Sequence, residues 1–273
     1  MLAKQTRSKL AAMITVLTAV VACQSQIPTS APAALDPTID KILTRLENRT
    51  VSDLQAELTW KLRYVIDLEE DAQLKKGRIW YQQQDPSARF LIHFSKKIVS
   101  NRAHQLDERH MFDGRWYTEL KSETKTITRR EIRRPGDEAD PYKLGEGPFP
   151  VPFGQKKADI LKEFEVTRIP PADDDPENTD HLRLTPREGT QTGQNYKQVE
   201  VWIAREGPQN GLPVTVRASK KSGTGQVNSF LTITFKNVKL NQGFSGSVFK
   251  IDKPAGYDEH VENLEPITPP STP

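Results

Sequence analysis

The chain has 273 residues, of which 35% are hydrophobic and 27% are charged, with 39 Lys and Arg against 36 Asp and Glu. The three surplus cations are Lys4, Arg7 and Lys9, so the rest of the chain is formally neutral. A neutral chain has no overall electrostatic attraction for nucleic acid, and we expect no nucleic-acid partner. The single cysteine excludes an intrachain disulfide, so stability must come from an ordinary hydrophobic core.

Residues 1–22 have the pattern of a secretory signal. Their basic residues precede an apolar run from Leu10 to Ala22, which at about 13 residues is too short to span a bilayer core. The run ends in Val20-Val21-Ala22-Cys23, which resembles a bacterial lipobox, where a small residue precedes the cleavage point. We therefore expect acylation of Cys23 and attachment to the membrane through this lipid anchor. The alternative is an ordinary signal peptide with an incidental cysteine.

A flexible tether is predicted for residues 23–35, which are rich in Pro, Ser and Ala and show no periodicity. We expect the folded domain over 36–260 and a disordered tail over 261–273. Asp36-Pro37 has the residues of a helix N-cap followed by proline in the first turn. Apolar residues at helical spacing then predict a short amphipathic helix over 37–48, with Ile39, Ile42, Leu43 and Leu46 on one face.

From Leu54 the apolar residues occupy every second position, which predicts a long, half-buried strand over 54–66. Short alternating runs with turn signals between them predict a series of further strands. These runs are 77–84, 88–95, 107–112, 115–121, 124–133, 163–169, 180–186, 197–204, 213–219, 227–236 and 246–251. The predicted fold class is mainly β: an antiparallel sheet curled into an incomplete barrel with short covering helices.

The strand pattern is interrupted between residues 134 and 163. Prolines and glycines over 134–154 exclude a long regular element, and 155–164 has one apolar helical face. An apolar loop and a short helix at this point are suited to cover the concave side of a curved sheet. The predicted lid residues are Leu144, Phe149, Val151, Phe153 and Leu161.

No catalytic or metal-binding pattern is present among the histidines or around the serines. The five histidines form no i, i+4 pair and no Cys/His cluster, and there is no G-x-S-x-G. We expect no enzymatic activity, no cofactor and no metal. The arginine pairs 129–130 and 133–134 form a basic patch, which either solvates a strand or faces lipid headgroups or an acidic partner.

Four stretches, taken together and in order, resemble the outer-membrane lipoprotein carrier superfamily, the fold of the periplasmic carrier LolA and its receptor LolB. The first is a helix followed by a long strand, and the second resembles the family's "G-x-hydrophobic-W … P-x-x-F" strand pair. The third resembles its "S-D-G-K-x-L-W-x-Y" hairpin, and the fourth is a closing tail. The last three are Gly77–Tyr81 with Pro86 and Phe90, Phe112–Tyr117, and Leu182–Pro186 through Phe249–Tyr257.

The resemblance implies an apolar interior that binds the acyl chains of lipoproteins or of another amphiphile. The side chains expected to line it are Leu58, Trp60, Leu62, Tyr64, Ile79, Tyr81, Phe90, Ile92, Phe94, Val201, Ile203, Leu231, Ile233 and Phe235. In the family a basic residue precedes the strand-two proline and helps to hold the lid. Here Gln82–Asp85 precede Pro86, so a lid of that kind is in doubt.

Two functions remain open at this point. The first is a lipid-anchored envelope protein, a monomer, whose ligand is an acylated lipoprotein or lipid. Gln24 after the cysteine favours the outer membrane, with the domain facing the periplasm and a role in lipoprotein sorting. The alternative is a non-enzymatic interaction or sensor module, in which the same side chains fill a solid core and the surface acts.

Overall fold

The computed structural model describes residues 35–49, 51–65, 72–84, 88–134 and 155–265. All of its described helices and strands belong to one compact unit that begins at Leu35. The predicted signal, Cys23, the tether up to residue 34 and the lid residues Leu144, Phe149, Val151 and Phe153 lie outside the described residues. No helix in the described ranges is long and apolar enough to cross a membrane.

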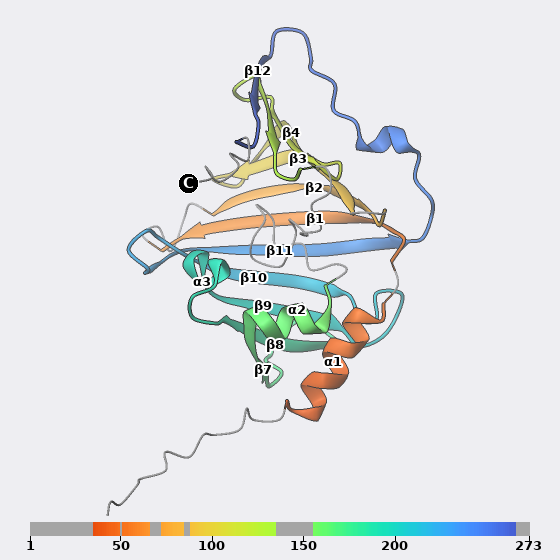
Figure 1. Cartoon of the computed structure of the whole chain (residues 1–273), viewed down its shortest axis with the longest axis vertical. Helices are drawn as coiled ribbons and strands as arrows, with labels where there is room; N and C mark the ends of the chain where they lie inside the picture. The colour runs from red at the N-terminus through yellow and green to blue at the C-terminus, as the bar shows by residue number, and fades with distance from the viewer. Residues whose placement is uncertain (1–34, 50, 66–71, 85–87, 135–154, 266–273) are drawn as a thin grey trace, which may run out of the picture. The chain divides into compact units, whose positions relative to one another are not determined.

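Twelve strands form one sheet with the order β12-β6-β5-β4-β3-β2-β1-β11-β10-β9-β8-β7 (Figure 1). Neighbouring strands are antiparallel, except that β12 lies parallel to β6. The sheet keeps two edges, β12 and β7, and is not closed, so the predicted mainly β fold with an incomplete barrel is confirmed. The strands are β1 Asp53–Tyr64, β2 Gln73–Gln82, β3 Arg89–Val99, β4 Arg102–Phe112, β5 Trp116–Lys121, β6 Thr126–Glu131, β7 Phe164–Ile169, β8 Thr179–Pro186, β9 Tyr196–Ala204, β10 Pro213–Lys221, β11 Val227–Leu240 and β12 Asp258–Glu262.

The inner face of the sheet is the face that carries the even-numbered residues of β1, and it holds the larger core. Because successive strand residues point to opposite faces, the alternation seen in the sequence places Leu54, Ala56 and Leu58 on this face. Helices α1 (Pro37–Glu47) and α2 (Lys157–Glu163) pack on the same core, through Ile42, Leu43 and Ile160 among others. A third helix, α3 (Gln191–Asn195), precedes β9.

Local sequence signals account for the ends of two elements. Asp36 caps α1 as predicted, since its Oδ1 accepts a hydrogen bond from the Thr38 N–H at 2.6 Å. In the turn between β4 and β5, Asp113 Oδ1 accepts from the N–H groups of Arg115 and Trp116, at 2.9 and 2.8 Å. Asp-Gly is a residue pair that favours tight hairpin turns.

The outer face carries a smaller core under a C-terminal strap, residues 244–257. Phe249 and Ile251 of the strap are buried against Met111 and Leu120 of the sheet. The strand predicted over 246–251 is wrong: this segment contains the 3-10 turn η1 (Gly246–Phe249), and the last strand is β12. The apolar residues of the strap are buried by lying across the sheet, while the edge of β6 is paired with β12.

A buried carboxylate holds the segment that leads from β11 into the strap. Asp53, which is 4% exposed, accepts hydrogen bonds from the N–H groups of Gln242 and Gly243 at 2.7 and 2.9 Å. Charge-assisted bonds of this kind are about twice as strong as neutral ones. The start of the strap is therefore fixed to the first residue of β1.

Candidate functional site

Thirteen of the fourteen predicted lining residues belong to the larger core on the inner face or pack against it, and Tyr64 lies at the end of β1 on the same face. Eleven of them are buried, Trp60 and Leu62 are partly buried and packed against the core, and Tyr64 is 40% exposed. The predicted lid residue Leu161, on α2, is also partly buried against this core. Whether the lining encloses a ligand cavity stays a prediction.

Exposure rises along β1, which locates the candidate site. Leu54 and Leu58 are 0% and 2% exposed, Trp60 and Leu62 are half-buried, and Tyr64 is 40% exposed. Cross-strand neighbours Ile233 and Leu231 remain buried beside Trp60 and Leu62. We call Trp60, Leu62 and Tyr64 the apolar stripe. It is the part of the inner face where apolar side chains of β1 remain partly accessible.

An ionic cluster that the sequence reasoning missed borders the apolar stripe. Lys75 Nζ lies 2.8 and 2.6 Å from the two carboxylate oxygens of Glu108, and His110 Nε2 lies 2.7 Å from Glu108 Oε1. Lys75 Nζ also lies over the rings of Trp60 and Phe94, 5.1 and 5.6 Å from their centroids. The charges of the cluster are thus in direct contact with an aromatic ring of the stripe.

The contacts within the cluster keep Glu108 ionised and orient the His110 ring toward it. Burial by itself would raise the pKa of Glu108, but hydrogen bonds and charges from His110 and Lys75 outweigh burial and lower it to about 2. An ionised carboxylate only accepts, so Nε2 of His110 carries a proton. The other ring nitrogen of His110, Nδ1, lies 2.7 Å from the hydroxyl oxygen of Tyr117. Burial raises the pKa of Tyr117 above its ordinary value, so this hydroxyl remains protonated.

The cluster could have been recognised from the alternation of inward and outward side chains along each strand. Gly77, Ile79 and Tyr81 point inward from β2, and Lys75 has the same phase. Phe112 points inward from β4, so His110 and Glu108 do too. Charged residues at inward positions of alternating strands are a signal for a buried ionic group. Pairing them correctly, however, requires the strand order, because β3 lies between β2 and β4.

The basic patch expected at the two arginine pairs is largely neutralised where the structure describes it. Arg129 Nε lies 2.8 Å from Glu259 Oε1, and Arg130 Nε lies 2.7 Å from Glu262 Oε2. Both carboxylates belong to β12, which follows the strap by way of Pro254–Tyr257. Arg133 is buried rather than exposed. Arg129 and Arg130 bind the last strand of the sheet, which favours a structural role for them.

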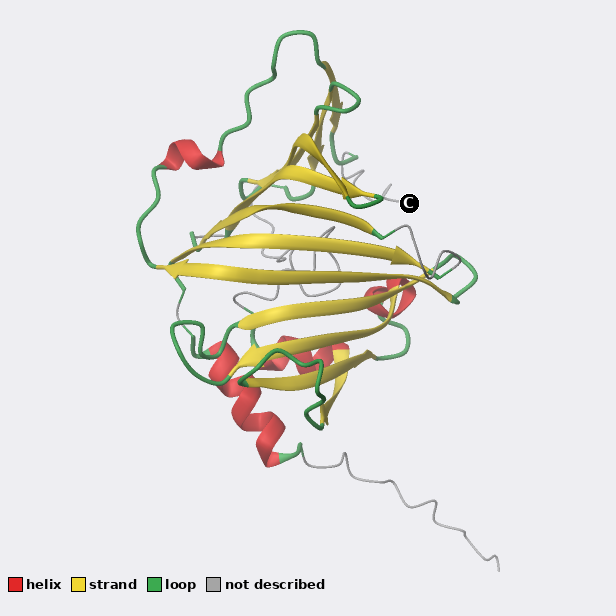
Figure 2. Ribbon diagram, turned by 180° about the vertical axis from the view of Figure 1, so that it is seen from behind, coloured by secondary structure: helices red, strands yellow, loops and turns green. Residues whose placement is uncertain are grey.

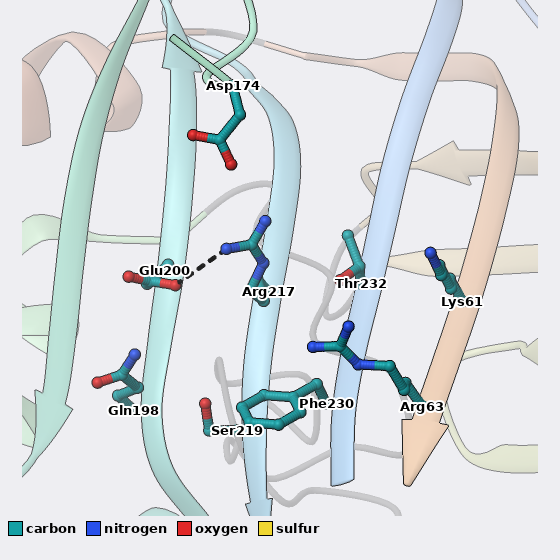
Figure 3. Close-up of a pocket in the computed structure, with 9 residues that line it drawn as sticks. All are labelled: Lys61, Arg63, Asp174, Gln198, Glu200, Arg217, Ser219, Phe230 and Thr232. Carbon is teal, nitrogen blue, oxygen red and sulfur yellow. Dashed lines mark ion pairs between the residues drawn. The ribbon is translucent and has the colours of Figure 1, made fainter. Parts of the chain in front are cut away.

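The outer face has a polar groove of about 400 Å³ across β1, β11, β10 and β9 (Figure 3). Lys61 and Arg63 line one side of it, and Arg217 approaches Glu200 with 3.7 Å between Nη1 and Oε2. Arg63 also lies over the Phe230 ring, 5.4 Å from its centroid. Within the described ranges, no group of three or more His, Cys, Asp or Glu side chains is placed to hold a metal ion.

No family model and no curated protein matches the chain. An uncharacterised conserved protein from Thermus thermophilus matches with 12% identity and a TM-score of 0.45, over 82% of this chain and 99% of that one. A LolA superfamily protein from Nitrosomonas europaea matches with 10% identity and a TM-score of 0.38, over 78% and 97%. The Mycobacterium tuberculosis lipoprotein LppX matches with 10% identity and a TM-score of 0.38, over 76% and 98%. Each of these matches spans more than three quarters of this chain and nearly all of the other protein.

Proposed function

We propose that the protein is a non-enzymatic carrier or receptor that binds the acyl chains of a lipid or an acylated lipoprotein on its inner face. The observation that carries this proposal is the apolar stripe. Large apolar side chains are normally buried in a soluble core, yet Trp60, Leu62 and Tyr64 stay partly accessible beside one. An acyl chain laid along the stripe gains about 0.8 kcal/mol for each buried methylene, before the cost of ordering the chain.

The ionic cluster suits the polar end of such a ligand. Lys75 is held by Glu108 and lies over the Trp60 ring, so the apolar stripe adjoins a buried ionic group. An amphiphile has the same division between an apolar and a polar part. The ligand is therefore expected to lie with its chain along the stripe and its headgroup toward β4.

One observation favours the second function, an interaction or sensor module with a filled core. Eleven of the fourteen expected lining residues are buried among other side chains. In that case the inner face serves stability alone, and the protein acts through its surface. The two functions predict different behaviour for Trp60.

Quenching of tryptophan fluorescence by a brominated fatty acid separates the two functions. Bromine quenches only at short range, and the neighbouring strands supply a matched pair of half-buried indoles: Trp60 points inward from β1, and Trp80 points outward from β2. The experiment uses residues 35–273, which contain the whole described unit, with dibromostearate as quencher and stearate as blank.

Acyl binding on the inner face predicts that dibromostearate quenches the unmodified protein and the Trp80→Phe variant. The Trp60→Phe variant should lose most of the quenching. Equal quenching in both variants, or none in the unmodified protein, would contradict the proposal and favour a filled core.

We also infer that Cys23 is acylated after removal of residues 1–22, and that residues 23–35 tether the domain to the outer membrane on its periplasmic side. The support for this is the lipobox-like Val20–Cys23. Replacing Cys23 by Ser in the full chain should move the protein from the membrane fraction to the soluble periplasmic fraction. Retention of the Cys23→Ser variant in the membrane fraction would contradict lipid anchoring through this cysteine.

A further inference from the structure

Six cations stand together on the outer face of four neighbouring strands, β11, β1, β2 and β3. All six side chains belong to exposed residues, and none lies within ion-pair distance of a carboxylate among the described residues. We call them the outer cationic patch: Lys61, Arg63, Lys76, Arg78, Lys96 and Lys236. The patch differs from Arg129 and Arg130 of β6, which form ion pairs with Glu259 and Glu262 of β12.

The strand register places like charges opposite one another in the patch. Lys76 of β2 is the direct cross-strand neighbour of Lys96 of β3. Like charges in this arrangement destabilise a sheet. Two carboxylates lie near the patch: Glu57 is the cross-strand neighbour of both Lys236 and Arg78, and Asp174 lines the groove that contains Lys61 and Arg63. An external anion bound at Lys76 and Lys96 would relieve their repulsion.

The six cations are exposed beside the strap, which packs near Trp80 and Leu91 farther along β2 and β3. The described helices α1 and α2 pack on the inner face, and Figure 2 shows the strands β1 and β11 from the other side with no described helix in front of them. A groove of about 660 Å³ is lined by Lys76, Arg78, Lys96 and Lys236. The groove of Figure 3 continues along β1 to Lys61 and Arg63.

We propose that the outer cationic patch binds the surface of a bilayer that contains anionic phospholipids. Strands lie about 4.8 Å apart, so the charges on four strands are spread over roughly 15 Å. This spread suits an extended anionic surface better than a single small anion. Four of the six cations are lysines. A lysine ammonium is a hydrated point charge, which suits diffuse attraction to many headgroups, whereas an arginine guanidinium suits bidentate hydrogen bonds to one anion. The inference is independent of the proposed function, because it concerns headgroups and the opposite face of the sheet.

Co-sedimentation with vesicles tests this inference. Residues 35–273 are used, which removes Cys23 and leaves the described unit whole. The vesicles are phosphatidylcholine alone, or phosphatidylcholine with one-third phosphatidylglycerol. We expect binding to the anionic vesicles only, and we expect it to weaken between about 0.05 and 0.5 M NaCl as the charges are screened.

The test variant is the double substitution Lys76→Gln with Lys96→Gln. Each cation near an anionic bilayer contributes about a fivefold change in partitioning, so the variant should bind roughly 25-fold more weakly. It should melt no lower than the unmodified protein, because it removes a repulsion. The matched control is Lys41→Gln with Lys162→Gln, which removes the same charge from exposed positions on α1 and α2 and should keep full binding.

Three results would overturn the inference. These are equal binding to both kinds of vesicle, equal loss in the test and control variants, and binding to immobilised polyglutamate with none to phosphatidylglycerol vesicles. The last result would assign the patch to an acidic protein partner. The Trp60→Phe variant separates this inference from the proposed function, since it should bind anionic vesicles normally whether or not acyl chains reach the inner face.

Discussion

The buried carboxylate of Glu108 is expected to stabilise the fold by an amount that depends on pH. Its pKa is lowered from 4.5 to about 2, because hydrogen bonds and charges from His110 and Lys75 outweigh the effect of burial. That lowering corresponds to about 3 kcal/mol of stability. A group with a lowered pKa stabilises fully above its unfolded value, here about pH 4.5, and the stabilisation is lost as the pH falls toward 2.

The substitution Glu108→Gln keeps the shape of the side chain and removes its charge. At pH 7 it should lower the free energy of unfolding by about 3 kcal/mol, since Lys75 and His110 lose their anion. The deficit should shrink between pH 4.5 and pH 2, where the unmodified protein loses the same interaction.

Urea unfolding of both proteins at several pH values measures this difference. Glu206→Gln, at an exposed position between β9 and β10, serves as control and should change stability by less than about 0.5 kcal/mol at any pH. Parallel stability curves for Glu108→Gln and the unmodified protein across this range would refute the assignment of the stabilisation to the carboxylate charge.

Three further substitutions test the packing of the fold. In Gly77→Ala the new Cβ would lie 2.0 Å from the carbonyl oxygen of His93, so thermal unfolding should show a loss of at least about 2 kcal/mol, whereas Gly223→Ala, with open space around it, should be nearly neutral. Asp53→Ala removes the acceptor that holds the strap and should cost about 2 kcal/mol, with faster hydrogen exchange at residues 242 and 243; unchanged exchange there would count against this anchor. Asp36→Ala removes the cap of α1 and should cost about 1 kcal/mol, seen as a melting temperature lower by about 2–4 °C.

Alternation in the sequence was sufficient to predict which side chains of the sheet point inward. Leu58, Ile79 and Phe94 are buried on one face because side-chain direction in a strand depends only on position within the strand. The helix over 37–47 was predictable for a similar reason, since its cap and its apolar face are both local features. The strand assignment of 246–251 failed because a short apolar alternation is equally well buried by an irregular strap.

The candidate site was only half predictable. Trp60, Leu62 and Tyr64 were identified as inner-face residues, but their different exposures depend on what packs beside each one. Lys75 and Glu108 are 33 positions apart and come from strands that are not neighbours. No local pattern could have joined them.

The sequence by itself therefore determined the elements and the two faces of the sheet, because both follow from the local periodicity of side chains. Only the tertiary structure decided which charges are neutralised. Lys75 and Lys76 are adjacent in the chain, yet Lys75 points inward to Glu108, whereas Lys76 points outward and faces Lys96. The physical reason is that an ion pair depends on strand order and register, which are set by contacts between distant parts of the chain.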